Sequence, residues 1–201
     1  MRLFVAVPIP QEIVEFTGAI IGNLQKENWP VRWVNPENAH ITLHFLGQIS
    51  QEQSELLRFA LRQPVATHPG FDLRTANLGV FPNMKRPRVL WLGLYGPAHR
   101  LHTLHDELGK VLEELDFDLD QSGEFHPHIT LGRLRNTANL PKDIPLRIRA
   151  RFEAITERGM VTDKQPLPFP VREIHLVRSH LNAEGARYEI LERFPLAEPI
   201  S

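Results

Sequence analysis

Residues 40–43 read His-Ile-Thr-Leu, and residues 128–131 repeat the same four residues 88 positions further along the chain. Both copies lie in stretches rich in β-branched and apolar residues, which favours β-strands. Because side chains alternate along a strand, the His and Thr of each copy share one face while the Ile and Leu point into the core. The repeat indicates two similar lobes related by a pseudo-twofold axis. It predicts that the two His-Thr pairs face one another across a cleft.

Strand and helix patterns alternate on both sides of the repeat. The sequence predicts helices that begin near residues 10, 50 and 97, where apolar residues recur at steps of three and four. The stretch from Asn136 to Pro170 contains five prolines and is predicted to be irregular, with one helix around Arg149–Glu157. Strands are predicted over residues 2–7, 31–34, 39–46, 71–78, 88–94, 125–131, 171–178 and 186–191. Strand pairs followed by single helices predict an α+β fold with mostly antiparallel sheet.

Composition narrows the classes of protein that fit. The chain has 201 residues, of which 42% are hydrophobic, so we expect residues 1–201 to form a single two-lobed globular unit. Its 23 Lys and Arg against 24 Asp and Glu give a net charge of −1, so any contact with a polyanion is local. The only tight basic cluster is residues 85–88, either a solvated loop or a contact with an RNA backbone. The absence of cysteine excludes disulfides and thiolate catalysis.

Expectations about cellular location and oligomeric state depend on features that the sequence lacks. The apolar stretch before Pro8 is shorter than a secretory signal, and no stretch approaches the roughly 20 apolar residues of a membrane helix. We therefore expect a cytoplasmic protein without membrane contact. No heptad pattern or obvious adhesive edge is present, so we also expect a monomer with no obligate protein partner.

The chemistry of the repeated motif points to a phosphodiester. Histidine titrates near neutrality, so His40 and His128 can divide the work of general acid and general base. The hydroxyls of Thr42 and Thr130 can donate hydrogen bonds to anionic oxygens, and Arg133 adds a planar cationic donor. Hydrolysis of a phosphodiester needs an activated water, a protonated leaving oxygen and donors to the non-bridging oxygens. This set requires neither a metal nor a cofactor.

Further characteristic stretches flank the two motifs. They are residues 32–34 (Arg-Trp-Val), 38–43 (Asn-Ala-His-Ile-Thr-Leu), 45–47 (Phe-Leu-Gly), 88–91 (Arg-Val-Leu-Trp), 126–131 (His-Pro-His-Ile-Thr-Leu) and 185–188 (Gly-Ala-Arg-Tyr). With these stretches the chain resembles the two-histidine phosphoesterases, and most closely the bacterial and archaeal RNA 2′,3′-cyclic phosphodiesterases, historically called 2′-5′ RNA ligases. The resemblance extends from residue 1 to about residue 196. It is weakest between residues 136 and 170, where prolines interrupt the helix that is usual in the family.

The resemblance implies a fold, an activity and a division of roles. It implies two lobes with helices on the outside and both motifs facing a central groove. It implies hydrolysis of a 2′,3′-cyclic phosphate, at an RNA 3′ end or on a nucleotide, to a 2′-phosphate, with reversible 2′-5′ ligation as a weaker activity. His40 would be the proton donor to the leaving 3′ oxygen and His128 the proton acceptor that activates water. Thr42 and Thr130 would hold the phosphate oxygens.

Several residues near the motifs have two interpretations. His126 and His44 either support the motif histidines and line the groove or hold a metal ion, since imidazole suits zinc. No carboxylate lies within the motifs to complete such a site, so we predict no metal. Phe45 either stacks on a nucleobase or belongs to the core, because it lies an even number of positions after Ile41 and Leu43 along the strand. Arg133 binds phosphate or is a surface charge at a strand end.

The helix that begins near residue 97 carries three further histidines. His99, His102 and His105 follow at three-residue steps, which permits a metal site, but the apolar stripe of the same helix favours a solvated face for them. Two other functions therefore remain beside the metal-independent enzyme. One is a metal-dependent phosphodiesterase, and the other is a module that binds RNA ends without turnover.

Overall fold

Two antiparallel sheets form the framework of the computed structural model, which describes residues 1–119, 124–135, 140–157, 166–182 and 185–199. The first sheet has the strand order β3-β1-β8-β9. Its strands are β1 (Arg2–Pro8), β3 (His40–Gln48), β8 (Glu173–Asn182) and β9 (Gly185–Pro195). The second sheet has the order β2-β6-β5-β4-β7. Its strands are β2 (Val31–Trp33), β4 (Phe71–Phe81), β5 (Val89–Tyr95), β6 (His128–Leu134) and β7 (Pro168–Val171). Each sheet therefore contains one of the two motif strands, β3 or β6.

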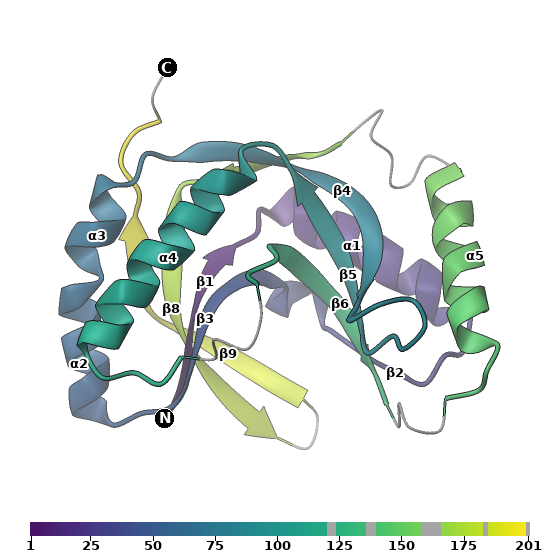
Figure 1. The fold of residues 1–201 in the computed structure, drawn as a ribbon, viewed down its shortest axis with the longest axis horizontal. Helices are drawn as coiled ribbons and strands as arrows, with labels where there is room; N and C mark the ends of the chain where they lie inside the picture. Colours follow the sequence, from purple (N-terminus) through teal and green to yellow (C-terminus); the bar gives the residue numbers. More distant parts are fainter. Residues whose placement is uncertain (120–123, 136–139, 158–165, 183–184, 200–201) are drawn as a thin grey trace.

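Helices lie on the outside of this framework (Figure 1). They are α1 (Gln11–Gln25), α2 (Gln51–Ala60), α3 (Arg62–Thr67), α4 (Ala98–Glu114) and α5 (Ile144–Glu157), with a short 3-10 turn, η1, at Pro36–Asn38. In Figure 1, α2, α3 and α4 lie in the left half with the first sheet, and α5 lies at the far right with the second. None of the helices among the described residues combines the length and the apolar character that a membrane span requires.

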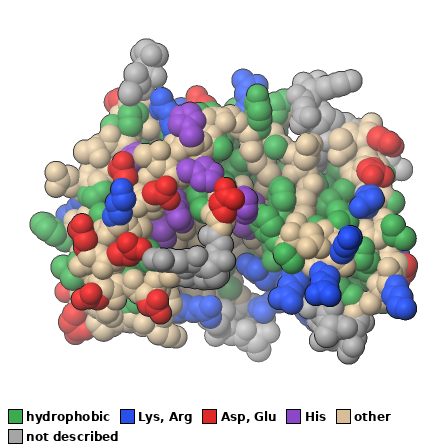
Figure 2. Space-filling model, in the orientation of Figure 1, with side chains coloured by type: hydrophobic (Ala, Val, Ile, Leu, Met, Phe, Trp, Pro, Cys, Tyr) green, Lys and Arg blue, Asp and Glu red, His purple; other side chains and the backbone are tan. Residues whose placement is uncertain are grey.

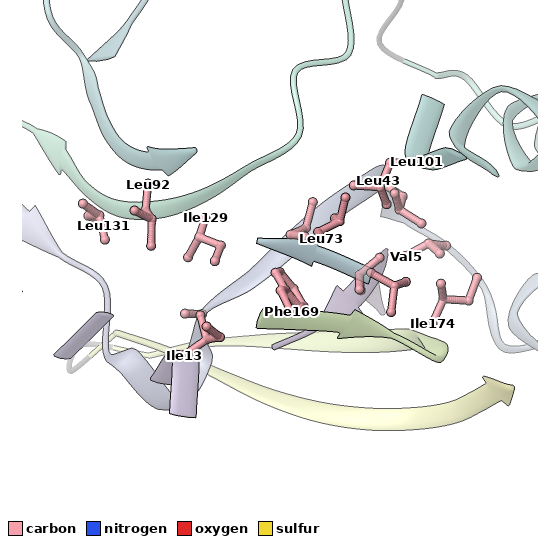
Figure 3. Packing of buried hydrophobic residues seen from close by; sticks show 14 of the residues in the cluster. Val5, Ile13, Leu43, Leu73, Leu92, Leu101, Ile129, Leu131, Phe169 and Ile174 are labelled. Carbon is pink, nitrogen blue, oxygen red and sulfur yellow. The ribbon is translucent and has the colours of Figure 1, made fainter. Parts of the chain in front are cut away.

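The apolar residues of both motifs are buried as the alternation predicts. Ile41 and Leu43 of β3, and Ile129 and Leu131 of β6, belong to one hydrophobic cluster that joins the two lobes. Figure 3 shows Leu43, Ile129 and Leu131 among the packed side chains of this cluster. The motif strands are thus held by their apolar faces, which leaves the His and Thr face of each strand available for another use.

Three segments differ from the sequence prediction. α5 begins at Ile144 and not near residue 149, because Pro145 lies in its first turn, where proline costs no hydrogen bond. β7 falls in a stretch predicted to be irregular, and its prolines are tolerated because β7 is an edge strand. The helix predicted to begin near residue 50 starts with a capping box between Ser50 and Gln53, which the Ser-x-x-Gln spacing predicts, but it is divided into α2 and α3.

One apolar residue of α2 does not face the core. Leu56 is 49% exposed, although the apolar spacing of the helix predicted to begin near residue 50 predicts its burial beside Leu57.

The sequence also predicts a turn over residues 182–185 between the last two strands, and residues 183 and 184 of this turn lie outside the described residues.

The burial of the motif strands predicts their contribution to stability. We expect Ile129→Ala, at a fully buried position, to lower the free energy of unfolding by about 2–5 kcal/mol because it removes core contacts and leaves a cavity. Urea denaturation of both proteins measures this difference. Leu146→Ala on α5, where the side chain is 67% exposed, is the control and should change the value by no more than about 0.5 kcal/mol. Equal effects of the two substitutions would contradict the assignment of Ile129 to the core.

Candidate active site

A cavity of about 730 Å³ lies between the two motif strands. Thr42 and Phe45 line it from β3, and His128, Thr130 and Arg133 line it from β6. The remaining lining residues are Leu43, His44, Phe81, Val89, His105, Asp106, Gly109, Lys110, Glu113, Leu119, Glu124, Phe125 and His126. Figure 2 shows histidine side chains gathered in the hollow of this face. The volume is within the usual range for a site that binds a small molecule or a nucleotide.

A β-bulge explains why Phe45 faces the cavity. In the pairing of β1 with β3, Thr42 lies opposite Ala6 and His44 lies opposite Val5, so Leu43 is an additional residue without a partner. A bulge of this kind reverses the alternation of the side chains that follow it. Phe45 therefore shares the face of Thr42, and it is 58% exposed. The prediction that parity places Phe45 in the core was wrong for this reason.

The second motif strand contains the same irregularity at the equivalent position. In the pairing of β5 with β6, Trp91 lies opposite Thr130 and Leu90 lies opposite Gly132, which leaves Leu131 as the additional residue. The reversal that follows brings Arg133 to the same face as Thr130. Arg133 thus occupies in the second lobe the position that Phe45 occupies in the first, and its exposed side chain lines the cavity.

The motif histidines are oriented in the same way. Nδ1 of His40 lies 2.8 Å from the carbonyl oxygen of Asn38, and Nδ1 of His128 lies 2.6 Å from that of His126. A carbonyl oxygen can only accept a hydrogen bond, so Nδ1 donates in both rings and Nε2 is the nitrogen left to exchange a proton. The side-chain amide of Asn38 also donates to the carbonyl oxygen of Ala186 at 2.8 Å. This hydrogen bond attaches to β9 the residue whose carbonyl orients His40.

Aromatic rings surround His40. Its ring stacks on Phe4 with centroids 4.7 Å apart and meets the edge of Tyr188 at 5.4 Å. Phe4 could not be identified as a neighbour of His40 from the sequence, because an apolar residue in a predicted strand gives no signal of its own. Tyr188 lies in one of the stretches that carry the family resemblance.

A similar pair of rings lies beside His128. Phe81 contacts its ring edge-on at 4.9 Å, and Trp91 lies at 6.4 Å. Trp91 lies flat over Gly79, where a Cβ atom would come within 2.1 Å of the indole ring, so only glycine allows this position. Phe81 also stacks on His126 at 5.8 Å. His126 lines the cavity and supports His128 through its backbone carbonyl, as one of its two interpretations predicted.

Burial and positive charge lower the pKa of both motif histidines. For His40 the main cause is burial, and the charges of His128 and Arg133 lower its pKa further. For His128 burial is again the main cause, with Arg133 and His126 adding to it. The hydrogen bonds to the backbone carbonyls act in the opposite direction. His40 is not among the residues that line the cavity, but these interactions place it within electrostatic range of both His128 and Arg133.

The wall beside the motifs contains His44. Its Nε2 lies 2.8 Å from the carbonyl oxygen of His105, and burial lowers its pKa to about 4. Its ring stacks on the ring of His105 with centroids 4.2 Å apart. The other face of His105 stacks on Phe125 at 4.2 Å, and His102 meets Phe125 edge-on. The solvated face predicted for these helix histidines is therefore wrong for His105, whose ring is packed between two others.

Two alternatives raised by the sequence concern a metal site and the basic cluster at residues 85–88. The described residues contain no group of three or more His, Asp or Glu side chains arranged to hold a metal ion. The side chains of Lys85, Arg86 and Arg88 are exposed in or beside the loop between β4 and β5, and none of them lines the cavity. Their contact with RNA stays a prediction.

Comparisons with known proteins agree with this geometry. The sequence profile described as the 2′-5′ RNA ligase superfamily matches residues 11–183. The chain belongs to this superfamily. A relative from Thermotoga maritima named RNA 2′,3′-cyclic phosphodiesterase is 33% identical over 191 residues, which is 95% of this chain and 93% of the relative. The membership that the two motifs and their flanks predict is therefore confirmed.

Solved structures of the superfamily share the fold. A crystal structure from Thermus thermophilus aligns with a TM-score of 0.73 at 27% identity and covers 98% of this chain and 99% of its own. E. coli LigT in complex with 3′-AMP aligns with a TM-score of 0.70 at 26% identity and covers 98% of both chains. The predicted α+β fold with two antiparallel lobes is confirmed by this similarity and by the two sheets described above.

The position of Arg133 predicts a change in the titration of both histidines. We expect Arg133→Gln to raise the pKa values of His40 and His128, because a positive charge that disfavours both imidazolium forms is removed. NMR titration of the ring protons measures the two values. Arg147→Gln on α5 removes the same charge beside Glu27 and Asp143 and is the matched control. Titration curves that do not change in the Arg133 variant would contradict this placement.

Proposed function

We propose that the protein hydrolyses the 2′,3′-cyclic phosphate of an RNA 3′ end or nucleotide to a 2′-phosphomonoester by acid–base catalysis with two histidines. The observation that carries the proposal is the duplicated histidine, each held at Nδ1 by a carbonyl two residues earlier. The names of the relatives support the substrate class. A pair of titrating groups with their Nε2 atoms free fits proton transfer, whereas a module that only binds RNA ends needs donors to phosphate but no titrating pair.

The proposed reaction gives one role to each of the motif histidines and uses both threonines and Arg133 as donors. Nε2 of neutral His128 accepts a proton from a water molecule, whose oxygen forms the new bond to phosphorus. Nε2 of protonated His40 donates its proton to the 3′ oxygen as the bond between phosphorus and that oxygen breaks, which leaves a 2′-phosphate and a 3′-hydroxyl. Thr42, Thr130 and Arg133 donate hydrogen bonds to the non-bridging oxygens. Ligation follows the same path with an RNA 5′-hydroxyl in place of water, and the reverse reaction exchanges the two histidine roles.

The groups that the cavity supplies support a reaction without a metal ion. A divalent metal in phosphodiester hydrolysis activates water and neutralises charge on the phosphate. Here His128 can activate the water and Arg133 can carry the positive charge. His44, the other ligand considered for a metal, has its Nε2 at the His105 carbonyl. The proposal therefore predicts that turnover continues after a chelator has removed divalent metal ions.

The first test removes each histidine. We expect His40→Ala and His128→Ala each to reduce turnover of an oligonucleotide that ends in a 2′,3′-cyclic phosphate by at least about 10²-fold, since each loses one proton-transfer step. Turnover by the unaltered protein should be the same with and without EDTA. His99→Ala, at an exposed position on α4, is the control and should retain full activity. Near-normal activity of either motif variant would refute the mechanism, and loss of activity in EDTA would favour the metal-dependent reaction.

The second test is the dependence of the rate on pH. The active form carries one proton shared between the two histidines, so kcat/KM should be bell-shaped, and its two limbs report the pair jointly. Both pKa values are lowered from 6.5 in the free protein, so we expect the optimum of kcat/KM below pH 6.5 and a decline on the alkaline side. The optimum of kcat should lie at higher pH, because a bound phosphate anion stabilises the imidazolium. An optimum of kcat/KM well above pH 7 would contradict the lowered values.

A further inference from the structure

Three arginines beside the motif strands have no acidic partner among the described residues. Arg32 of β2 lies directly opposite Arg133 of β6, and Arg2 lies at the start of β1. All three side chains are exposed, and none has a carboxylate of the described residues within 4.0 Å. Like charges directly opposite one another on two strands are destabilising, so an anion bound beside Arg32 and Arg133 would relieve their repulsion.

Tyr188 links the three arginines to the catalytic pair. In the first sheet Arg2 lies opposite Ser179, and Ser179 lies opposite Tyr188, so the three residues form one row across β1, β8 and β9. The Tyr188 ring lies 5.4 Å from the ring of His40. Burial raises the pKa of Tyr188, while the charges of Arg133, Arg2 and Arg32 lower it, so all three cations lie within electrostatic range of its hydroxyl.

Acidic and basic side chains both line the cavity. They are Asp106 and Glu113 of α4 with Glu124, and Lys110 of α4 with Arg133 of β6. On the face shown in Figure 2, Lys and Arg side chains gather below and to the right of the central histidines, and Asp and Glu gather mainly to the left. A polyanion at this face is attracted toward the part where Lys and Arg gather.

We propose that Arg2, Arg32 and Tyr188 bind the phosphodiester that neighbours the cyclic phosphate, so that the preferred substrate is an oligonucleotide end and not a mononucleotide. The inference rests on the proposed function, because it places the cyclic phosphate at the two histidines and Arg133. A guanidinium presents a planar fork of donors that matches phosphate oxygens, and the Tyr188 hydroxyl adds one further donor. The second phosphate would also neutralise the charge of Arg32 facing Arg133.

The test compares two substrates that differ by one nucleotide. They are adenosine 2′,3′-cyclic phosphate and the dinucleotide of two adenosines, joined by one phosphodiester, that ends in a 2′,3′-cyclic phosphate. We expect the unaltered protein to have at least about tenfold higher kcat/KM on the dinucleotide. Arg32→Gln and Arg2→Gln should each remove most of this advantage and leave kcat/KM on the mononucleotide unchanged. The slope of log kcat/KM against log salt should be steeper for the dinucleotide by about 0.7, and the variants should lose this difference.

The controls separate the possible failures. Arg147→Gln removes one exposed arginine on α5 and should change neither substrate. If the unaltered protein uses both substrates equally, or if Arg32→Gln impairs both equally, the second phosphate site is refuted while the proposed function stands. If neither substrate is hydrolysed, the proposed function fails. In that case calorimetry with the corresponding 2′-phosphate mononucleotide and dinucleotide still tests the second phosphate site. The site predicts that the dinucleotide binds more tightly than the mononucleotide and that Arg32→Gln removes this difference.

Discussion

The alternation of side chains along β3 and β6 controls this structure, because it divides each motif strand between two tasks. One face carries Ile and Leu into the core that joins the lobes, and the other carries His and Thr, of which Thr42, His128 and Thr130 line the cavity. A strand that kept this alternation would offer only those two polar residues. The bulges at Leu43 and Leu131 reverse it one residue after each Thr, so that Phe45 and Arg133 also face the cavity. The face of each motif strand that carries His and Thr thereby gains a third side chain while the core contacts of the strand are kept.

Electrostatics then defines what such a cavity can hold. The chain is nearly neutral, and the cavity is lined by charges of both signs, with Asp106, Glu113 and Glu124 on the one hand and Lys110 and Arg133 on the other. Burial and Arg133 keep both histidines mostly neutral near pH 7. An anion bound between them reverses part of this effect and favours the proton that catalysis requires. A phosphate bound at the site would therefore stabilise the protonated form of a histidine that is mostly neutral without it.

The sequence predicts those features that depend on local patterns. The strands, the opposing faces of the motifs and the capping box at Ser50 follow from alternation and residue type, and the structure contains them. A bulge is a property of two paired strands, so β3 alone could not show that Phe45 faces the cavity. The environment of His105 depends on His44 and Phe125, which come from other parts of the chain. Its helix alone indicated a solvated face.

The two lobes are alike in backbone but not in the residue that follows each bulge. Phe45 is apolar, while Arg133, 88 positions later, is a permanent cation on the same strand face as His128. A fixed positive charge beside an imidazole favours its neutral form, which is the form that a general base needs. His40 lies among the rings of Phe4 and Tyr188, and the charges of both His128 and Arg133 lower its pKa. When His128 is neutral, one of these two charges is absent, while Arg133 acts on both rings. A neutral His128 thus favours the proton on His40, which agrees with the roles of base and acid that we propose for them.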